Sequence, residues 1–163
     1  MADKLTIMRA EKKDSKTILY FIKELAKYER LEHEVVATEE LIEKNLFGEN
    51  SKAEAILGYW ENKPVAFAIF FHNFSTFLAK PGLYLEDLFV LPEMRGKGFG
   101  KQMLQHLAKL AKERDCGRLE WWVLDWNQPA INFYKSIDAV PMDEWTVFRL
   151  TGDALNNLAD SEN

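Results

Sequence analysis

Hydrophobic positions in the first half of the chain alternate between helix spacing and strand spacing. Residues 5–10 alternate apolar and polar side chains and predict a short strand. From Ser15 the apolar positions follow helical spacing to Ala26, and the cap-like Thr38 predicts a second helix ending near Phe47. Residues 53–60 and 64–72 predict two strands joined by a hairpin loop at 61–63, and Pro81-Gly82 predicts a turn before a strand over 83–90.

The second half predicts helices that cross between strands. A helix is expected over residues 101–115, with Gly117 as a left-handed stop, followed by an aromatic strand over 119–123. Asn127 is a candidate cap for the next helix, which has Pro129 in its first turn. A last strand over 145–150 and a short helix over 153–158 complete the order. This order predicts an α/β (α+β) fold around one sheet, in a single domain of residues 1–163.

Composition narrows the class of function. The 163 residues are 47% hydrophobic and 29% charged, which is ordinary for a soluble globular protein. The net charge of −5 argues against a nucleic-acid binder and suits a cationic substrate. Cys116 is the one cysteine, so no intrachain disulfide is expected. A reducing, cytoplasmic location is therefore the expected one. No apolar run approaches the roughly 20 residues of a membrane span, and the histidines lack metal-ligand spacing.

A glycine-rich loop lies between the expected strand at 83–90 and the helix that follows. Such a loop exposes backbone N–H groups at a helix start, where the helix dipole favours an anion and most naturally a phosphate. It is not a phosphate loop of the Walker type, and its place in mid-chain differs from that of a Rossmann fingerprint. By itself it fits a plain glycine turn equally well. The glycines are Gly96, Gly98 and Gly100, and the flanking cations are Arg95, Lys97 and Lys101.

Several motifs in the same order resemble the GNAT superfamily of N-acetyltransferases. The family signature, Gln/Arg-x-x-Gly-x-Gly/Ala after the fourth strand, matches Arg95, Gly98 and Gly100. Residues 24–29, 84–87 and 123–127 resemble the diamine branch, which contains the spermidine/spermine and thialysine N-acetyltransferases. The resemblance runs nearly the full length. It implies the GNAT fold, a mixed and mostly antiparallel sheet, flanked by helices, with a V-shaped splay between strands 4 and 5.

The resemblance implies acetyl-CoA as the co-substrate. The loop N–H groups would hold its pyrophosphate, and the fourth strand would pair with its pantetheine arm. A backbone N–H near Phe89 would meet the thioester carbonyl as an oxyanion hole, and Asn127 would bond the arm from the other side. The residues expected to bind acetyl-CoA are Leu88, Phe89, Val90, Arg95, Gly96, Lys97, Gly98, Phe99, Gly100, Lys101, Asn127, Pro129, Ala130 and Tyr134.

Two residues are candidates for acid–base catalysis of direct acetyl transfer. Tyr134 matches the family's catalytic tyrosine and is expected to protonate the departing CoA sulfur, although spacing alone would place it in the core. Glu86 is the candidate base, acting either through a water molecule or directly. A carboxylate inside an apolar strand would be costly unless it lay in a cleft.

The amine site is expected to be acidic with aromatic walls, because both stabilise an ammonium group. Tyr28 and Glu29 match substrate-contacting positions of the diamine branch. In a regular strand Asp87 would point away from the face of Glu86, and a bulge, which the family has at this place, would change that alternation. The remaining candidates are Glu86, Asp87, Glu120, Trp121, Trp122, and either Asp143 or Glu144.

Two departures from the family pattern affect the expected function. Asp138 stands where the family usually has a turn glycine, and aspartate tolerates the left-handed conformation better than most residues. Residues 73–82 lack the acidic residue that the spermidine enzymes place before the fourth strand, so a lysine analogue or short diamine is as strong a candidate as a polyamine.

The sequence therefore predicts an acetyl-CoA-dependent N-acetyltransferase. Its expected substrate is a primary amine of a small cationic molecule, either a diamine or polyamine or a thialysine- or lysine-like amino acid. The alternatives are a protein or peptide N-acetyltransferase and a non-catalytic CoA-binding module on the same fold. No nucleic-acid, membrane or metal partner is expected. The resemblance implies a homodimer with the C-terminal strand near the partner, and Trp145, Val147 and Phe148 offer apolar surface for it.

Overall fold

A five-stranded sheet organises the first part of the chain in the computed structural model, which describes residues 3–161. The chain divides into two units, one ending at Trp122 and the other beginning at Val123, and each is described by itself. The strands lie in sequence order across the sheet: β1 (Thr6–Arg9), β2 (Glu54–Trp60), β3 (Lys63–Ser75), β4 (Lys80–Val90) and β5 (Leu119–Trp121).

The strand pairing is mixed and mostly antiparallel. Strands β1 to β4 pair antiparallel, and β5 pairs parallel to β4. The hairpin between β2 and β3 turns through Glu61 and Asn62, both with left-handed φ angles of 49° and 62°, because a two-residue hairpin turn needs positive φ. The predicted α/β (α+β) fold class is confirmed.

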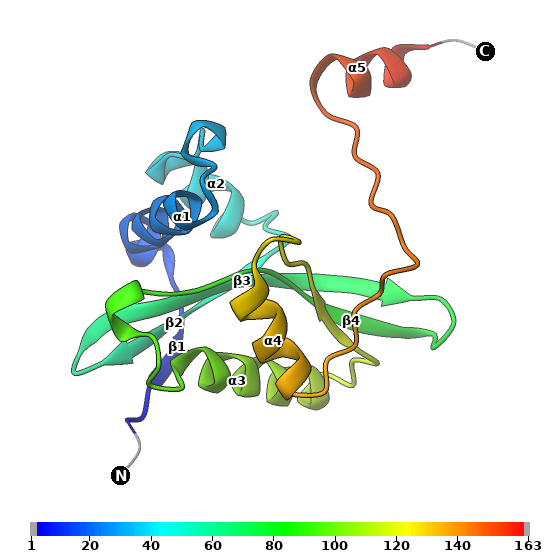
Figure 1. Ribbon diagram of the computed structural model, residues 1–163. Coiled ribbons are helices and arrows are strands. Elements are labelled where there is room, and N and C mark those ends of the chain that lie inside the picture. Colours follow the sequence, from blue (N-terminus) through cyan, green and yellow to red (C-terminus); the bar gives the residue numbers. More distant parts are fainter. Residues whose placement is uncertain (1–2, 162–163) are drawn as a thin grey trace. The chain divides into compact units, whose positions relative to one another are not determined.

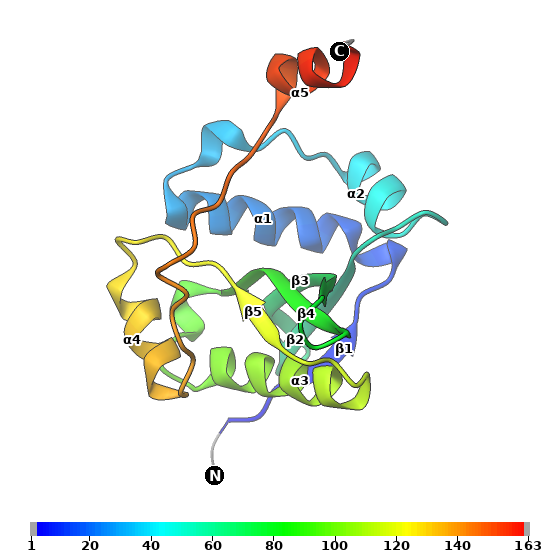
Figure 2. The same cartoon turned by 90° about the vertical axis from the view of Figure 1, so that its right-hand side faces the viewer.

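Helices cover both faces of the sheet in the first unit (Figures 1 and 2). On one face α1 (Ser15–Glu29) packs with α2 (Glu39–Leu46), and on the other lies α3 (Phe99–Glu113). On the α1 face the fully buried Phe21 and Phe67 stack with ring centroids 5.2 Å apart. On the α3 face a Cβ added to Gly58 would lie 3.1 Å from the sulfur of Met103, so glycine there admits the helix closely.

Short helical turns connect these elements, and the predicted helix starts are largely confirmed. Thr38 caps α2, accepting from the N–H of Leu41 at 3.2 Å. The helix expected over 101–115 begins earlier, directly after Gly98, and ends at Glu113. The short turns are the 3-10 helices η1 (Lys12–Asp14), η2 (Glu32–Glu34) and η3 (Pro92–Met94).

Two turn predictions were wrong. Pro81-Gly82 lies inside β4, where Gly82 sits opposite Asn73 and has no room for a side chain beside the Asn73 amide oxygen. The turn instead forms at residues 76–79 and ends with Ala79 at φ 51°. After α3 the left-handed residue is Asp115, at φ 53°, rather than Gly117.

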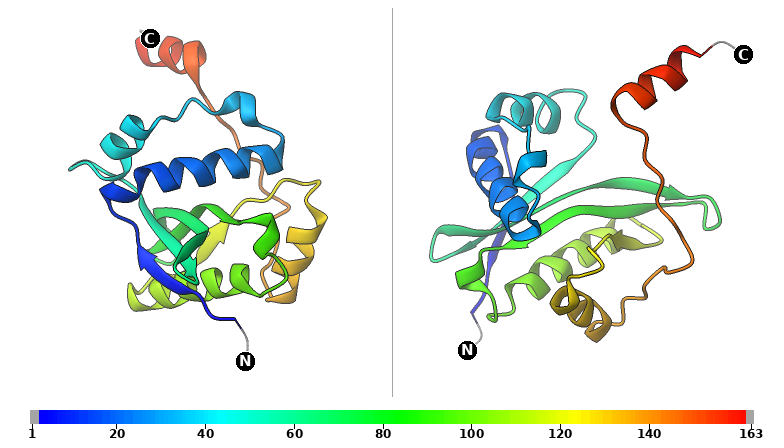
Figure 3. Two further views of the ribbon diagram at one scale, coloured as in Figure 1. Left: turned by 90° about the vertical axis from the view of Figure 1, so that its left-hand side faces the viewer. Right: turned by 45° about the horizontal axis from the view of Figure 1, so that its top comes forward.

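The second unit contains α4 (Gln128–Ser136) and α5 (Gly152–Asp160), joined by an extended segment that Figure 3 follows in two views. Asn127 caps α4, accepting from the N–H of Ala130 at 3.4 Å. Asp138 adopts the left-handed conformation at φ 62°, as expected for a residue in place of a turn glycine.

The predicted last strand over 145–150 does not form. Residues 145–150 have neither helical nor strand assignment, and no strand of the described chain pairs with them. A strand needs the N–H and C=O groups of a neighbour, so an apolar pattern alone cannot make one. Between residues 3 and 161, no helix is both long and apolar enough to cross a membrane.

Candidate functional site

The glycine loop joins β4 to α3 in a conformation that requires glycine. Gly96 and Gly98 both have φ 78°, and Gly98 is the N-cap residue of α3. A Cβ added at either position would meet nothing within 4 Å in the described chain. The first N–H groups of a helix have no acceptor within it, and the dipole makes this end favourable for an anion. The loop can therefore hold an anion by backbone groups alone.

Two of the three flanking cations, Arg95 and Lys97, contact other groups of the chain. The Arg95 Nε donates to the Val90 carbonyl oxygen at 3.2 Å, and its guanidinium lies 4.4 Å from the Tyr28 ring centroid. The Lys97 ammonium pairs with Asp3 at 3.1 Å and lies 4.7 Å from the Trp60 ring centroid. The sequence had offered both as anion contacts. The contacts of Arg95 and Lys97 are intramolecular, which leaves the backbone N–H groups as the stronger anion contact of the loop.

Strand β4 has one edge that β5 covers only in part. The ladder with β5 pairs Leu83, Tyr84 and Leu85, and β4 continues to Val90 beyond it. The parallel pairing of β4 with β5 is confirmed, and the predicted V-shaped splay between these two strands stays a prediction.

The β3–β4 register tells which peptide groups of β4 face that edge. The Leu91 N–H donates to the Val65 carbonyl at 3.0 Å, so this is a hydrogen-bonded pair of the antiparallel ladder. Such pairs alternate with non-bonded ones, which turns the peptide groups of Phe89 toward β3 and those of Leu88 and Val90 toward the open edge. The Arg95 contact to the Val90 oxygen agrees. For the expected N–H donor near Phe89, the register favours Leu88 or Val90.

A bulge in β4 determines which way the central carboxylates point. Ile69 pairs with Asp87, while the next residue, Phe70, pairs with Leu85, so Glu86 is an extra residue. Phe70 faces α3, where Arg114 lies 6.0 Å from its ring centroid, and Leu85 shares that face. The extra residue brings Asp87 to the α1 face. Asp87 thus lies on the same side as Phe89 and Leu91, which belong to the core cluster under α1.

Among the carboxylates of this site, Asp87 has the most strongly shifted pKa. Burial disfavours its charged form, and the charges of Glu86 and Glu29 disfavour it further, which together raise the pKa of Asp87 to about 7. Glu29, at the end of α1, also has its pKa raised by burial. Glu86 itself is exposed. Two acidic residues predicted to bind substrate, Glu29 and Asp87, are therefore brought together by α1 and β4.

An aromatic group accompanies these carboxylates. The ring centroids of Tyr28 and Phe89 lie 6.2 Å apart. The Arg95 guanidinium lies 4.4 Å from the Tyr28 ring centroid and 5.2 Å from that of Phe89. The cation over these two rings is therefore one of the chain's own, and the amine site at Tyr28 stays a prediction. The role of Arg95 on this face could not be read from the sequence, which indicated only its place beside the loop.

The candidates on β5 are engaged in different contacts. Glu120 accepts a hydrogen bond from the Asn73 side-chain amide and pairs with Arg118 at 3.0 Å. These contacts join β3 to β5. Trp122 meets Tyr84 edge-on, with centroids 5.9 Å apart, and Trp121 pairs opposite Leu85. The Glu120 carboxylate thus forms contacts within the sheet, in addition to its predicted contact with substrate.

The remaining candidates lie in the second unit. Asn127 is buried and caps α4, whose first turn contains Pro129 and Ala130. Tyr134 is half-buried on the same helix, with its ring centroid 5.6 Å from that of Phe133. Asp143 and Glu144 are both exposed in the extended segment before Trp145.

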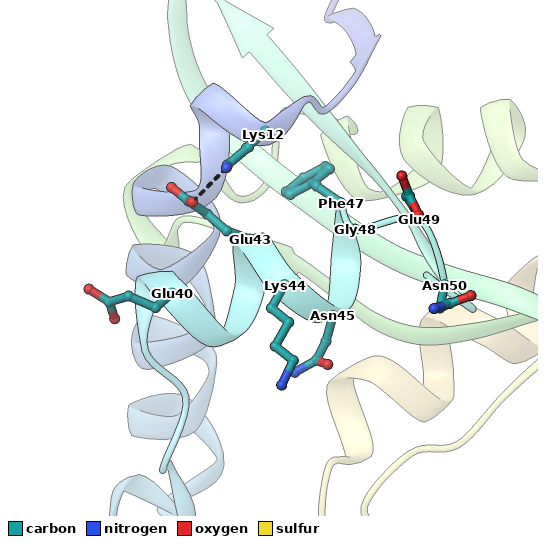
Figure 4. A pocket seen from close by; sticks show the side chains of 9 residues that line it. All are labelled: Lys12, Glu40, Glu43, Lys44, Asn45, Phe47, Gly48, Glu49 and Asn50. Carbon is teal, nitrogen blue, oxygen red and sulfur yellow. Dashed lines mark ion pairs between the residues drawn. The ribbon is translucent and has the colours of Figure 1, made fainter.

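Two open hollows in the first unit involve other residues. One of about 570 Å³ lies between η1 and α2 (Figure 4), where Lys12 pairs with Glu43 at 3.1 Å. Another, of about 610 Å³, runs from Arg9 to His72. Among the described residues, neither lining includes a residue that the sequence predicted for the site. The site is thus defined by the loop, the open edge of β4 and the end of α1.

Comparisons with known proteins agree with these features. The sequence model of the acetyltransferase (GNAT) family matches residues 18–138, a range that enters both units. The chain is 34% identical to a thialysine N-epsilon-acetyltransferase of Mus musculus, over 94% of this chain and 96% of that protein. It is 52% identical to an L-ornithine N5-acetyltransferase of Arabidopsis thaliana, over 56% of this chain and 40% of that protein. An integron cassette protein of V. cholerae has a similar structure, with a TM-score of 0.81 and 33% identity over 96% of this chain and 98% of that one.

We expect Asp87→Asn to stabilise the protein at alkaline pH. The pKa of Asp87 is about 7 in the folded protein, above its ordinary value of 3.8. The unfolded chain therefore releases the proton first, and Asp87 lowers stability progressively from about pH 4 to pH 7. At 1.36 kcal/mol per pKa unit the full effect is at most about 4 kcal/mol.

The measurement is thermal unfolding as a function of pH. Asp87→Asn is expected to melt above the wild type at about pH 8 and together with it near pH 4. The exposed Asp125 provides the matched control, Asp125→Asn, for which no such divergence is expected. A difference in Tm between wild type and Asp87→Asn that stays constant from pH 4 to pH 8 would contradict the raised pKa of Asp87.

Proposed function

Because the chain belongs to the acetyltransferase (GNAT) family, we propose that it acetylates a primary amine of a small cationic molecule, with acetyl-CoA as the donor. The chain is an N-acetyltransferase of this family, and its substrate class is the proposal. The observation that carries this proposal is the placement of Glu29 and Asp87 beside Tyr28 and Phe89. Carboxylates next to aromatic faces favour an ammonium group over a neutral or anionic one.

The loop and the open edge of β4 fit acetyl-CoA. Gly96 and Gly98 leave room at the start of α3, where backbone N–H groups suit a pyrophosphate. The outward peptide groups of Leu88 and Val90 can pair with an extended amide-containing arm as a neighbouring strand would. Acetyl-CoA supplies the thioester. The residues of this chain position the two substrates and transfer protons. The buried Phe99 side chain belongs to the core, so Phe99 can contribute only its backbone N–H.

The proposed chemistry is direct attack of the amine on the thioester. The ammonium group must first give up a proton, and a carboxylate of the Glu86–Asp87 pair would receive it. A β4 N–H on the open edge would stabilise the developing oxyanion. Tyr134 is proposed as the acid that protonates the departing sulfur. This role is supported by the match of Tyr134 to the family's catalytic tyrosine and by the family membership of the chain.

An amino acid with a terminal side-chain amine is the favoured substrate. Two relatives bear the names of enzymes for thialysine and L-ornithine, which both have this feature. A short diamine is the next candidate. A protein or peptide substrate, or CoA binding without catalysis, would be the alternatives. Homodimer formation and a cytoplasmic location stay predictions, and the exposed Trp145 and Phe148 support the former by offering apolar surface.

A panel of amines tests the substrate class. Thialysine, ornithine, lysine, putrescine, spermidine and a lysine-containing peptide would be compared by kcat/KM, with released CoA measured. We expect a free amino acid or short diamine to exceed the peptide by about tenfold or more, because its second ammonium group, which a peptide bond removes, can also bind the carboxylates of the site. A higher kcat/KM for the peptide than for the small amines would contradict the proposal and indicate a protein or peptide N-acetyltransferase.

We expect Gly98→Ala to weaken acetyl-CoA binding by about tenfold, since a left-handed alanine costs roughly 1–2 kcal/mol and the loop would shift to relieve it. Isothermal titration with acetyl-CoA measures the effect. Gly152→Ala is the matched control, because Gly152 also has positive φ, at 54°, with open space around it, and lies outside the loop. Equal affinities for the two variants would exclude the loop from acetyl-CoA binding.

Tyr134→Phe removes only the hydroxyl that we assign as the acid. Turnover is expected to fall by about 100-fold, the lower end for general acid catalysis. The Kd of acetyl-CoA should change little, because the ring remains. Phe133→Leu on the same helix tests whether packing alone explains the loss. An unaltered kcat in Tyr134→Phe would remove the acid role.

A further inference from the structure

The β4 bulge gives its two adjacent carboxylates different surroundings. Glu86 is the extra residue between the Ile69–Asp87 and Phe70–Leu85 pairs and is exposed to solvent. Asp87 is partly buried on the α1 face, on the side of the strand that also bears Phe89. A regular strand would have placed Asp87 on the α3 face, together with Leu85. One inserted residue therefore separates a solvated carboxylate from a shielded one.

We propose that Asp87, rather than Glu86, is the proton acceptor for the substrate ammonium. This inference rests on the proposed function and assigns a catalytic role within it. Asp87 directly precedes Leu88, whose peptide groups face the open edge of β4 where the thioester would lie. It also faces the end of α1, which carries the expected amine contacts Tyr28 and Glu29. Asp87 is thus the carboxylate adjacent to both reactants.

The charges around Asp87 suit a base that works near neutral pH. The groups that act on it are Glu29 from α1 and Glu86 from its own strand, and both are acidic. The cation on this face, Arg95, lies over the rings of Tyr28 and Phe89. Like charges and shielding from water strengthen the hold of a carboxylate on a proton, and a general base is most effective when its pKa lies near the working pH.

The proposed step balances in protons and bonds. The substrate ammonium gives one proton to an Asp87 carboxylate oxygen, which frees the nitrogen lone pair. The lone pair forms the C–N bond to the thioester carbon, and the C–S bond breaks. The nitrogen loses a second proton as the amide forms, and one proton goes to the CoA sulfur. Asp87 then releases its proton to solvent, so the net products are the acetamide, CoA and one proton.

The test compares Asp87→Asn with Glu86→Gln, an equivalent neutral substitution one residue away. Wild-type kcat/KM is expected to rise with pH through a midpoint near the Asp87 pKa of about 7. Asp87→Asn should lose this rise and lower kcat by about 100-fold or more, the usual contribution of a general base. Glu86→Gln should keep the rise but move its midpoint to lower pH, because it removes a charge that raises the pKa of Asp87. Acetyl-CoA should bind both variants within about threefold of the wild type, because the loop is untouched.

A titration without substrate gives an independent measurement. Carbon-13 labelling of the aspartate carboxyl groups would follow Asp87 by NMR, with its signal assigned by loss in Asp87→Asn. Its midpoint should fall when Glu29→Gln removes a repelling charge, and the kcat/KM midpoint should fall with it. A structural role for Asp87 would not link these two midpoints.

The outcomes separate this inference from the function on which it rests. An active wild type whose pH profile persists in Asp87→Asn and disappears in Glu86→Gln would overturn the assignment and give the role to Glu86. A wild type that acetylates no amine of the panel would overturn the proposed function, and this inference with it.

Discussion

The antiparallel pairing of β3 with β4 is the interaction on which the rest of the site depends. Its register fixes which β4 peptide groups are used inside the sheet and which remain at the open edge. A single extra residue, Glu86, changes the alternation of side chains halfway along the strand. The residues before it bury Leu83 and Leu85 toward α3, and those after it bury Phe89 and Leu91 toward α1. The strand therefore supports both helical layers and still presents carboxylates between them.

Periodicity in the sequence was sufficient for most helices and for the β2–β3 hairpin, because those elements depend on local spacing. The glycine loop was likewise recognisable, since positive φ at Gly96 and Gly98 is a local demand. Pro81-Gly82 misled because both residues favour turns by themselves, while the close approach of Asn73 from β3 places them in a strand. The apolar pattern at 145–150 misled for a related reason, because no strand of the described chain pairs with it.

The candidate site shows the same division between local and distant information. The sequence and its resemblance to a family pointed to Tyr28, Glu29 and Asp87 as substrate contacts. They did not indicate how the two carboxylates differ, because that depends on the face to which the bulge turns each one. Glu120 was expected at the amine site from its aromatic neighbours, yet its contacts to Asn73 and Arg118 arise from strand pairing. Asn73 lies 47 positions from Glu120 in the chain, and a contact over that distance leaves no periodic pattern in the sequence.

The intramolecular contacts of Arg95 and Lys97 have a consequence for how acetyl-CoA is held. Interactions between exposed charges are screened by ions over about 10 Å at 0.1 M ionic strength, whereas short contacts to backbone dipoles are screened much less. Arg95 is committed to Tyr28, Phe89 and the Val90 carbonyl, and Lys97 to Asp3 and Trp60. If the loop holds the pyrophosphate as proposed, that contact depends on the shape of the loop more than on the charges of Arg95 and Lys97. Added salt is accordingly expected to weaken acetyl-CoA binding less than it would at a site built from free lysines.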